Sequence, residues 1–181
     1  MNTGRRSYAV ILYLTIVLAA AVFSVYAQAP VLVSADQLEK VVPSSFYFAG
    51  QVAPTQMRNG AAVRFGEKQN LVAALVDTSG YASNIRSMYE GFIISDIRIQ
   101  VSTGSAGSEN LPAGAYGFGF TEDGKMNVFD VGGKKLLTAT ANKDDKLQSP
   151  RPLMISIVQG NRVRLYRGKS YVELAPAASQ K

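Results

Sequence analysis

Turn-forming residue pairs, set between short runs of alternating apolar and polar residues, limit what this chain can fold into. In its second half these pairs are Asp123-Gly124, Gly132-Gly133, Gly160-Asn161 and Gly168-Lys169. Pairs of this kind close two-residue β-hairpins. Along the whole chain such signals predict about ten short strands joined as hairpin meanders, with one or two short helices. This pattern is typical of an all-β domain, either an antiparallel sandwich or a small closed barrel.

The predicted two-residue turns also assign side chains to faces. A turn at Asp123-Gly124 places Phe118 opposite Phe129, and a turn at Gly132-Gly133 places Phe129 opposite Leu136. One face would then carry Tyr116, Phe118, Phe120, Phe129, Val131 and Leu136. The opposite face would carry Gly117, Gly119, Met126, Val128, Leu137 and Ala139.

Two interpretations of the aromatic residues Tyr116, Phe118, Phe120 and Phe129 follow from this register. They form part of the core, or they line an apolar ligand cavity of the kind that small barrels enclose. The two glycines between them leave the other face bare, which permits strong twist or the close approach of another backbone, such as a neighbouring sheet or a helix at Ser34–Val42.

The first half of the chain mixes helix and strand signals. The segments Ser34–Val42 and Ser83–Gly91 each have a serine that can begin a helix, and "LVAALVD" is apolar enough for a strand buried on both faces. We also expect an alternating strand at "FYFAGQVAP", a turn at Asn59-Gly60, one half-exposed strand over Phe92–Val101 and a flexible loop over Ser102–Asn110.

The segment Leu153–Leu174 has a candidate interaction face. With turns at Gly160-Asn161 and Gly168-Lys169, one side would collect Met154, Val158, Val163, Leu165, Val172 and Leu174 as a core surface. The solvent side would carry Ile155, Ile157, Gln159, Arg162, Arg164, Tyr166, Tyr171 and Glu173, with Arg164 across from Glu173. Because Arg and Tyr favour interfaces, Arg162, Arg164, Tyr166 and Tyr171 could bind an acidic glycan, a phospholipid head group or a protein. The alternative is an ordinary solvated sheet face.

The first 27 residues resemble a secretory signal. Arg5 and Arg6 precede the apolar stretch Tyr8–Ala27, which ends in small residues suited to signal peptidase. The stretch is also just long enough to cross a bilayer, so an uncleaved anchor is the alternative. We divide the chain into a signal peptide or anchor (1–27), a short helical lead-in (28–44), a β-domain (45–175) and a disordered tail (176–181). We expect an exported protein, either periplasmic, in the cell envelope or extracellular, that contacts a membrane only if the segment is uncleaved.

The composition excludes several chemistries. The chain has no cysteine and no histidine, so disulfides, the usual zinc, copper, haem and iron–sulfur ligand sets, and Ser-His or Cys-His nucleophile pairs cannot form. We expect no cofactor and no metal. A formal charge of +6 is too small to indicate a nucleic-acid partner. Paired carboxylates from Asp77, Asp96, Asp130 and Glu173 are the remaining candidates for acid–base catalysis.

Three segments, "GFIISDIRI", "LPAGAYGFGF" and "GNRVRLYRGKSYV", carry a resemblance to exported bacterial β-rich proteins of uncharacterised function. The resemblance implies a β-fold and export, and it implies no activity.

The preferred functional hypothesis is an exported envelope or periplasmic β-domain with a non-enzymatic binding or structural role. Its partner would be a protein or a small apolar or glycan ligand. One alternative is a carboxylate-dependent enzyme that acts on a glycan. The other is a structural domain tethered to the membrane by Tyr8–Ala27.

Overall fold

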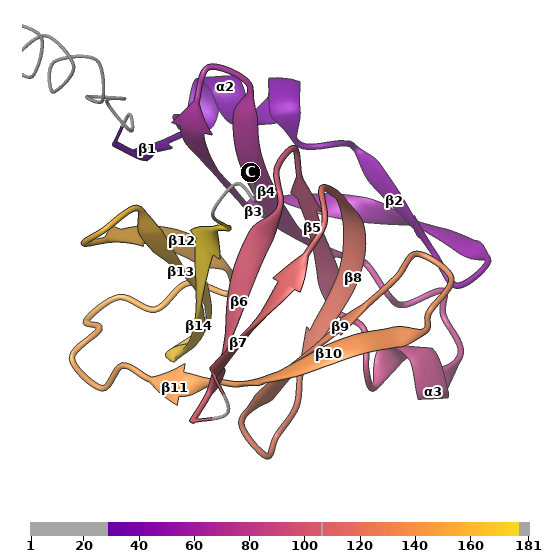
Figure 1. Ribbon diagram of the computed structural model, residues 1–181. Coiled ribbons are helices and arrows are strands. Elements are labelled where there is room, and N and C mark those ends of the chain that lie inside the picture. The colour runs from indigo at the N-terminus through magenta and orange to yellow at the C-terminus, as the bar shows by residue number, and fades with distance from the viewer. Residues whose placement is uncertain (1–28, 106, 178–181) are drawn as a thin grey trace, which may run out of the picture.

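The chain folds into two antiparallel β-sheets and two short helices over the residues described by the computed structural model, 29–105 and 107–177 (Figure 1). The all-β prediction is therefore confirmed. Neither sheet closes on itself in the described part of the chain. The predicted signal peptide or anchor and most of the predicted tail lie outside the described residues. No helix within 29–105 or 107–177 is long and apolar enough to cross a membrane.

The larger sheet has eight strands, with the order β1-β3-β4-β5-β8-β9-β10 and with β2 paired to β3. These strands are β1 (Val31–Leu32), β2 (Ser45–Phe48), β3 (Gln51–Gly66), β4 (Gln69–Val76), β5 (Gly91–Ser95), β8 (Gly114–Phe120), β9 (Lys125–Phe129) and β10 (Lys135–Thr140). The smaller sheet has six strands, with the order β12-β13-β14-β6-β7 and with β11 paired to β14. These strands are β6 (Ile99–Gly104), β7 (Gly107–Leu111), β11 (Asn142–Lys143), β12 (Met154–Val158), β13 (Arg162–Arg167) and β14 (Ser170–Pro176).

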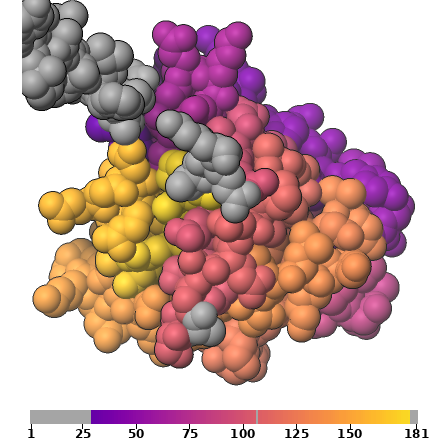
Figure 2. Space-filling view, viewed as in Figure 1, coloured from indigo at the N-terminus to yellow at the C-terminus, as the bar shows by residue number. Residues whose placement is uncertain are grey.

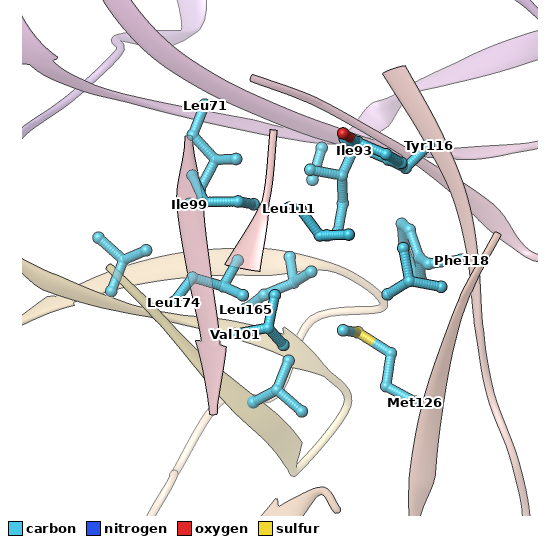
Figure 3. Close-up of a cluster of buried hydrophobic side chains, with 14 of the residues drawn as sticks. Leu71, Ile93, Ile99, Val101, Leu111, Tyr116, Phe118, Met126, Leu165 and Leu174 are labelled. Carbon is cyan, nitrogen blue, oxygen red and sulfur yellow. The ribbon is translucent and has the colours of Figure 1, made fainter. Parts of the chain in front are cut away.

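The main core lies between the two sheets (Figure 3). The larger sheet contributes Leu71, Ile93, Phe118 and Met126, and the smaller sheet contributes Ile99, Val101, Leu165 and Leu174, all of them almost fully buried. Burial of such side chains stabilises the fold by about 1.5–3 kcal/mol each.

A second hydrophobic cluster covers the other face of the larger sheet. The rings of Phe46 and Phe92 stack at 4.6 Å, and those of Phe48 and Tyr89 stack at 4.0 Å. This cluster explains the apolar run of β4, since alternate residues of that strand face the two clusters. The expectation of a strand buried on both faces is confirmed.

Helix α2 (Ala35–Val41) begins after Ser34, as its sequence predicts. Helix α3 (Ser83–Arg86) is shorter than predicted, because Glu90, near the predicted helix end, hydrogen-bonds to the larger sheet instead. The backbone N–H of Glu90 donates to the carbonyl of Phe118, and Tyr89 is fully buried in the second cluster.

Three predictions in the first half are wrong. The hairpin turn is at Ala49-Gly50, both with positive φ, and β3 continues through Asn59-Gly60 as an irregular stretch of its ladder with β4. The expected single strand Phe92–Val101 breaks after Ser95, whose hydroxyl donates to the carbonyl of Ile97, and the chain crosses from one sheet to the other. The expected loop Ser102–Asn110 is largely the β6–β7 hairpin.

The predicted register around Asp123-Gly124 is wrong by one residue. Phe118 pairs with Val128, and Gly117 pairs with Phe129. The turn has three residues, because Gly124 adopts a φ of 75° and the N–H of Thr121 donates to the carbonyl of Lys125. Phe118 therefore shares the core with Met126 and Val128, whereas Phe129 belongs to the second cluster. Val131 and Leu136, expected on the aromatic face, are about two-fifths exposed.

The two central glycines of "AYGFGF" face the second cluster. A Cβ on Gly119 would overlap the carbonyl oxygen of Met88, and a Cβ on Gly117 would lie 2.5 Å from the ring of Phe48. The close approach of backbone to Gly119 was expected, but it comes from the segment after α3 and not from α2.

Strand β12 is also displaced by one residue from its predicted position. Val158 pairs with Arg162 across a three-residue turn, so Ile155 faces the core beside Leu165, and Met154 faces outward beside Tyr166. The β13–β14 pairing follows the prediction, with Arg164 opposite Glu173.

Candidate functional site

The outer face of the smaller sheet brings polar side chains from five strands into one plane. Residues paired across antiparallel strands lie on the same face, so the ladders define rows across it. One row crosses the strands in the order β12, β13, β14, β6 and β7, and it contains Val158, Arg162, Ala175, Gln100 and Asn110. Its polar members are Arg162, Gln100 and Asn110. Neighbouring positions contribute Ser156, Arg164 and Glu173, and then Ser102 and Ser108. In the space-filling view, the yellow β13–β14 region and the pink β6–β7 region lie side by side at the surface (Figure 2).

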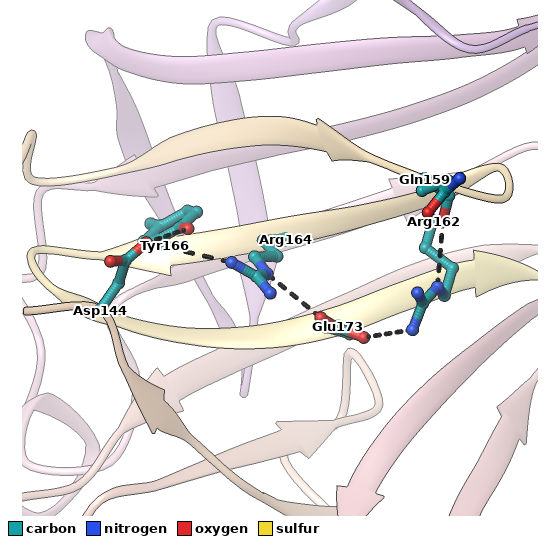
Figure 4. A network of polar contacts seen from close by, with 6 residues as sticks. All are labelled: Asp144, Gln159, Arg162, Arg164, Tyr166 and Glu173. Atoms are coloured by element: carbon teal, nitrogen blue, oxygen red, sulfur yellow. Dashed lines mark hydrogen bonds and ion pairs between the residues drawn. The ribbon is translucent and has the colours of Figure 1, made fainter. Parts of the chain in front are cut away.

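Glu173 is held by two arginines (Figure 4). Arg164 Nε donates to Glu173 Oε1 at 3.1 Å, and Arg162 Nη1 donates to Glu173 Oε2 at 2.9 Å. Arg162 Nε also donates to the carbonyl of Gln159 at 3.2 Å. Each carboxylate oxygen thus has its own guanidinium partner, which fixes the orientation of all three side chains.

Tyr166 and Asp144 continue this network toward β11. The Tyr166 hydroxyl donates to Asp144 Oδ2 at 2.9 Å, and Arg164 Nη1 lies 3.9 Å from the same oxygen. Burial raises the pKa of Tyr166, and the proximity of Tyr166, together with the hydrogen bond to Glu173, raises the pKa of Arg164. The network holds two arginines and two carboxylates, so its charges balance.

The tyrosine rings of this face are not open stacking platforms. Tyr166 is only 3% exposed, and the guanidinium carbon of Arg164 lies 4.3 Å from the centre of the Tyr171 ring. The two rings also contact each other, with centroids 5.1 Å apart. Tyr166 and Tyr171 therefore support the arginines.

A groove lies next to the network on the same face. It has a volume of ≈ 190 Å³, and its polar lining consists of Gln100, Ser102, Ser108, Arg162 and Glu173. Half of the Arg162 side chain is exposed here, whereas Glu173 is 22% exposed. An amide, two hydroxyls, a guanidinium and a carboxylate together offer both hydrogen-bond donors and acceptors.

The structure brings together the four residues of the predicted interaction face, Arg162, Arg164, Tyr166 and Tyr171. Four of their neighbours were not predicted from the sequence: Gln100, Ser102, Ser108 and Asp144. The first three join the face because β14 pairs with β6. The alternation of Gln100 and Ser102 with Ile99 and Val101 was the available signal for an exposed β6 face.

The predicted aromatic set does not surround a common cavity. Tyr116 and Phe118 lie in the main core (Figure 3). Phe120 packs at the edge of that core, and Phe129 lies in the second cluster across the sheet. The Tyr116 hydroxyl donates to the carbonyl of Pro112 at 2.7 Å, and burial raises its pKa. The prediction that all four rings share one face is therefore wrong, because the observed register turns Phe129 to the opposite face of the sheet.

The four candidate carboxylates lie apart. Asp77 follows the end of β4, whereas Asp96 accepts from Asn70 near its start, a separation of about 23 Å along an extended strand. Asp130 follows β9, three strands from β4 or about 14 Å across the sheet, and accepts from the N–H of Lys134. Glu173 is on the outer face of the other sheet. This spread does not favour a catalytic carboxylate pair.

Within residues 29–105 and 107–177, no group of three or more Asp and Glu side chains is placed to hold a metal ion. Comparison of the chain with models of known protein families, with curated protein sequences and with solved structures gives no match.

Proposed function

We propose that the chain is an exported, non-enzymatic β-domain that binds a neutral, hydroxyl-rich ligand, such as an oligosaccharide, on the outer face of its smaller sheet. The observation that carries this proposal is the polar groove beside the ordered Arg162–Glu173–Arg164 network. Two open sheets packed on one core also favour a sandwich over a closed barrel.

The groove suits a sugar because its polar groups are varied and partly fixed. A hydroxyl both donates and accepts a hydrogen bond, and the groove offers Gln100, Ser102 and Ser108 for both roles. The ion pairs hold Arg162 and Glu173 before a ligand arrives, so less side-chain entropy is lost on binding.

Charge balance favours a neutral ligand over an acidic one. Both arginines of the network already share Glu173, and Arg164 also lies near Asp144. An acidic glycan or phospholipid head group would have to compete with these carboxylates. This competition supports a neutral ligand over an acidic one.

Binding to an array of neutral and acidic oligosaccharides tests the proposal. The variant Gln100→Ala/Ser108→Ala removes groove hydrogen bonds without touching the ion pairs. With one hydrogen bond lost at each of the two residues, at about 1 kcal/mol apiece, it should weaken binding of neutral oligosaccharides about thirtyfold. The matched control Gln37→Ala/Ser44→Ala changes an exposed glutamine and serine elsewhere, and should bind as the wild type. Selective binding of acidic glycans, or equal binding by both variants, would contradict the proposal.

Export is tested separately by the intact mass of the protein from a secreting host. A chain that starts at Gln28 supports a cleaved signal, whereas retention of Tyr8–Ala27 supports the tethered alternative.

A further inference from the structure

A crevice opens where the edges of the two sheets meet. β1 is at one edge of the larger sheet and β12 is at one edge of the smaller sheet, and the two lie close together (Figure 1). The crevice between them has a volume of ≈ 190 Å³. It is separate from the groove, with which it shares no lining residue.

Apolar side chains form most of the crevice. Leu153 and Ile155 line it and also belong to the main core, while Ala62 and Leu38 connect it to the second cluster. Leu32, which is 47% exposed, borders it from β1. An apolar group in this crevice would contact both clusters and would cover an exposed leucine, which the hydrophobic effect favours.

Two arginines border the same crevice. Arg58 comes from β3, and Arg151 lies just before β12, and both are exposed. Neither has a carboxylate within 4.0 Å among the described residues, unlike Arg162, Arg164 and Arg167, which are all paired. A free guanidinium binds carboxylates through parallel hydrogen bonds.

We propose that this crevice binds a free amphipathic carboxylate, with its acyl chain against Leu153 and Ile155 and its carboxylate near Arg58 and Arg151. The charge complementarity of the two arginines argues for the anionic head, and the apolar lining argues for the chain. The crevice is smaller than the roughly 300–1,000 Å³ of most ligand pockets, so we expect it to take a single acyl chain of medium length.

Calorimetric titration of the purified chain with decanoate tests this inference. Decanoate should bind at least tenfold more tightly than decanol, which lacks the charge, and than acetate, which lacks the chain. The double variant Arg58→Gln/Arg151→Gln should lose at least tenfold in affinity for decanoate. Arg86→Gln/Arg98→Gln, which changes two exposed arginines outside the crevice, should keep it. A thermal unfolding scan of each variant checks that the fold is retained.

A second variant tests the location of the acyl chain. Ala35 is exposed and lines the crevice, so Ala35→Trp should obstruct the crevice and abolish decanoate binding. This substitution alters no buried residue. Equal affinity for decanoate and decanol, or wild-type affinity in the Arg58/Arg151 double variant, would overturn the inference. Binding to vesicles with anionic phospholipids but not to decanoate would also overturn it, and would indicate a membrane surface as the occupant.

Discussion

Glu90 and Arg167 join the two sheets through a bidentate ion pair. Arg167 Nε and Nη2 each donate to a different Glu90 carboxylate oxygen at 3.2 Å, although 77 residues separate the two side chains. Glu90 also accepts from the backbone N–H of Phe120 at 3.3 Å. The pair therefore links the end of β13 to the segment before β5 and to β8.

A double-mutant cycle with Glu90→Gln and Arg167→Met should measure this link. Because both side chains are partly shielded and the contact is bidentate, we expect a coupling free energy of about 1 kcal/mol that decreases in high salt. The exposed pair Asp123–Lys125 is the control and should show no measurable coupling. A Glu90–Arg167 coupling indistinguishable from that of the control would show that this ion pair does not help to hold the two sheets together.

Gly119 should not tolerate a side chain. Gly119→Val places a Cβ onto the carbonyl oxygen of Met88, which is backbone that cannot rotate away, so the free energy of unfolding should fall by about 3 kcal/mol. Chemical denaturation measures the change. Gly80→Ala is the control, because a Cβ there meets no atom within 4 Å, and it should change stability by less than about 0.5 kcal/mol. Equal stability of Gly119→Val and wild type would show that the contact with Met88 does not exist.

Tyr89 has a buried hydroxyl without a hydrogen-bond partner among the described residues. Tyr89→Phe removes that group and retains the stacking on Phe48, so it should stabilise the fold by about 1 kcal/mol. Tyr81→Phe should have the opposite effect, because the Tyr81 hydroxyl donates to the carbonyl of Gln51 at 3.0 Å. Destabilisation by Tyr89→Phe would indicate a partner for its hydroxyl, such as a buried water.

The stability of the fold should fall at alkaline pH. Burial raises the pKa of Tyr81, Tyr89, Tyr116 and Tyr166 above the ordinary value of 10.0. Below about pH 10 both the folded and unfolded states keep these protons, so the contribution is constant. Above it the unfolded state loses them first, and the free energy of unfolding decreases. Denaturant midpoints from pH 7 to pH 11 measure this, and Tyr89→Phe should flatten the decline. A constant midpoint across this range would contradict the burial of these phenols.

The local parts of the fold were readable from the sequence, and the parts set by turn length or distant pairing were not. Gly168-Lys169 closes a two-residue turn, so Arg164 opposite Glu173 was predictable. Asp123-Gly124 marks a turn just as clearly, but its third residue shifts the register and moves Phe129 to another face. The end of strand β5 at Ser95 could not be predicted, because no glycine or proline follows Ser95 to mark the break between β5 and β6.

The candidate site shows the same division. Its arginines and tyrosines alternate on one hairpin and were found from their periodicity. The groove itself depends on the pairing of β14 with β6, whose residues are far apart in sequence. Asp144 reaches Tyr166 from a connecting segment, and only the folded chain shows that contact.

The most direct test of the proposed function is an amide NMR titration with the neutral oligosaccharide that binds most tightly in the array. We expect chemical-shift changes concentrated at Gln100, Ser102, Ser108, Arg162 and Glu173, with little change around the crevice at Leu153 and Ile155. Shift changes centred elsewhere, or none at saturating oligosaccharide, would contradict the assignment of the outer face as the binding surface.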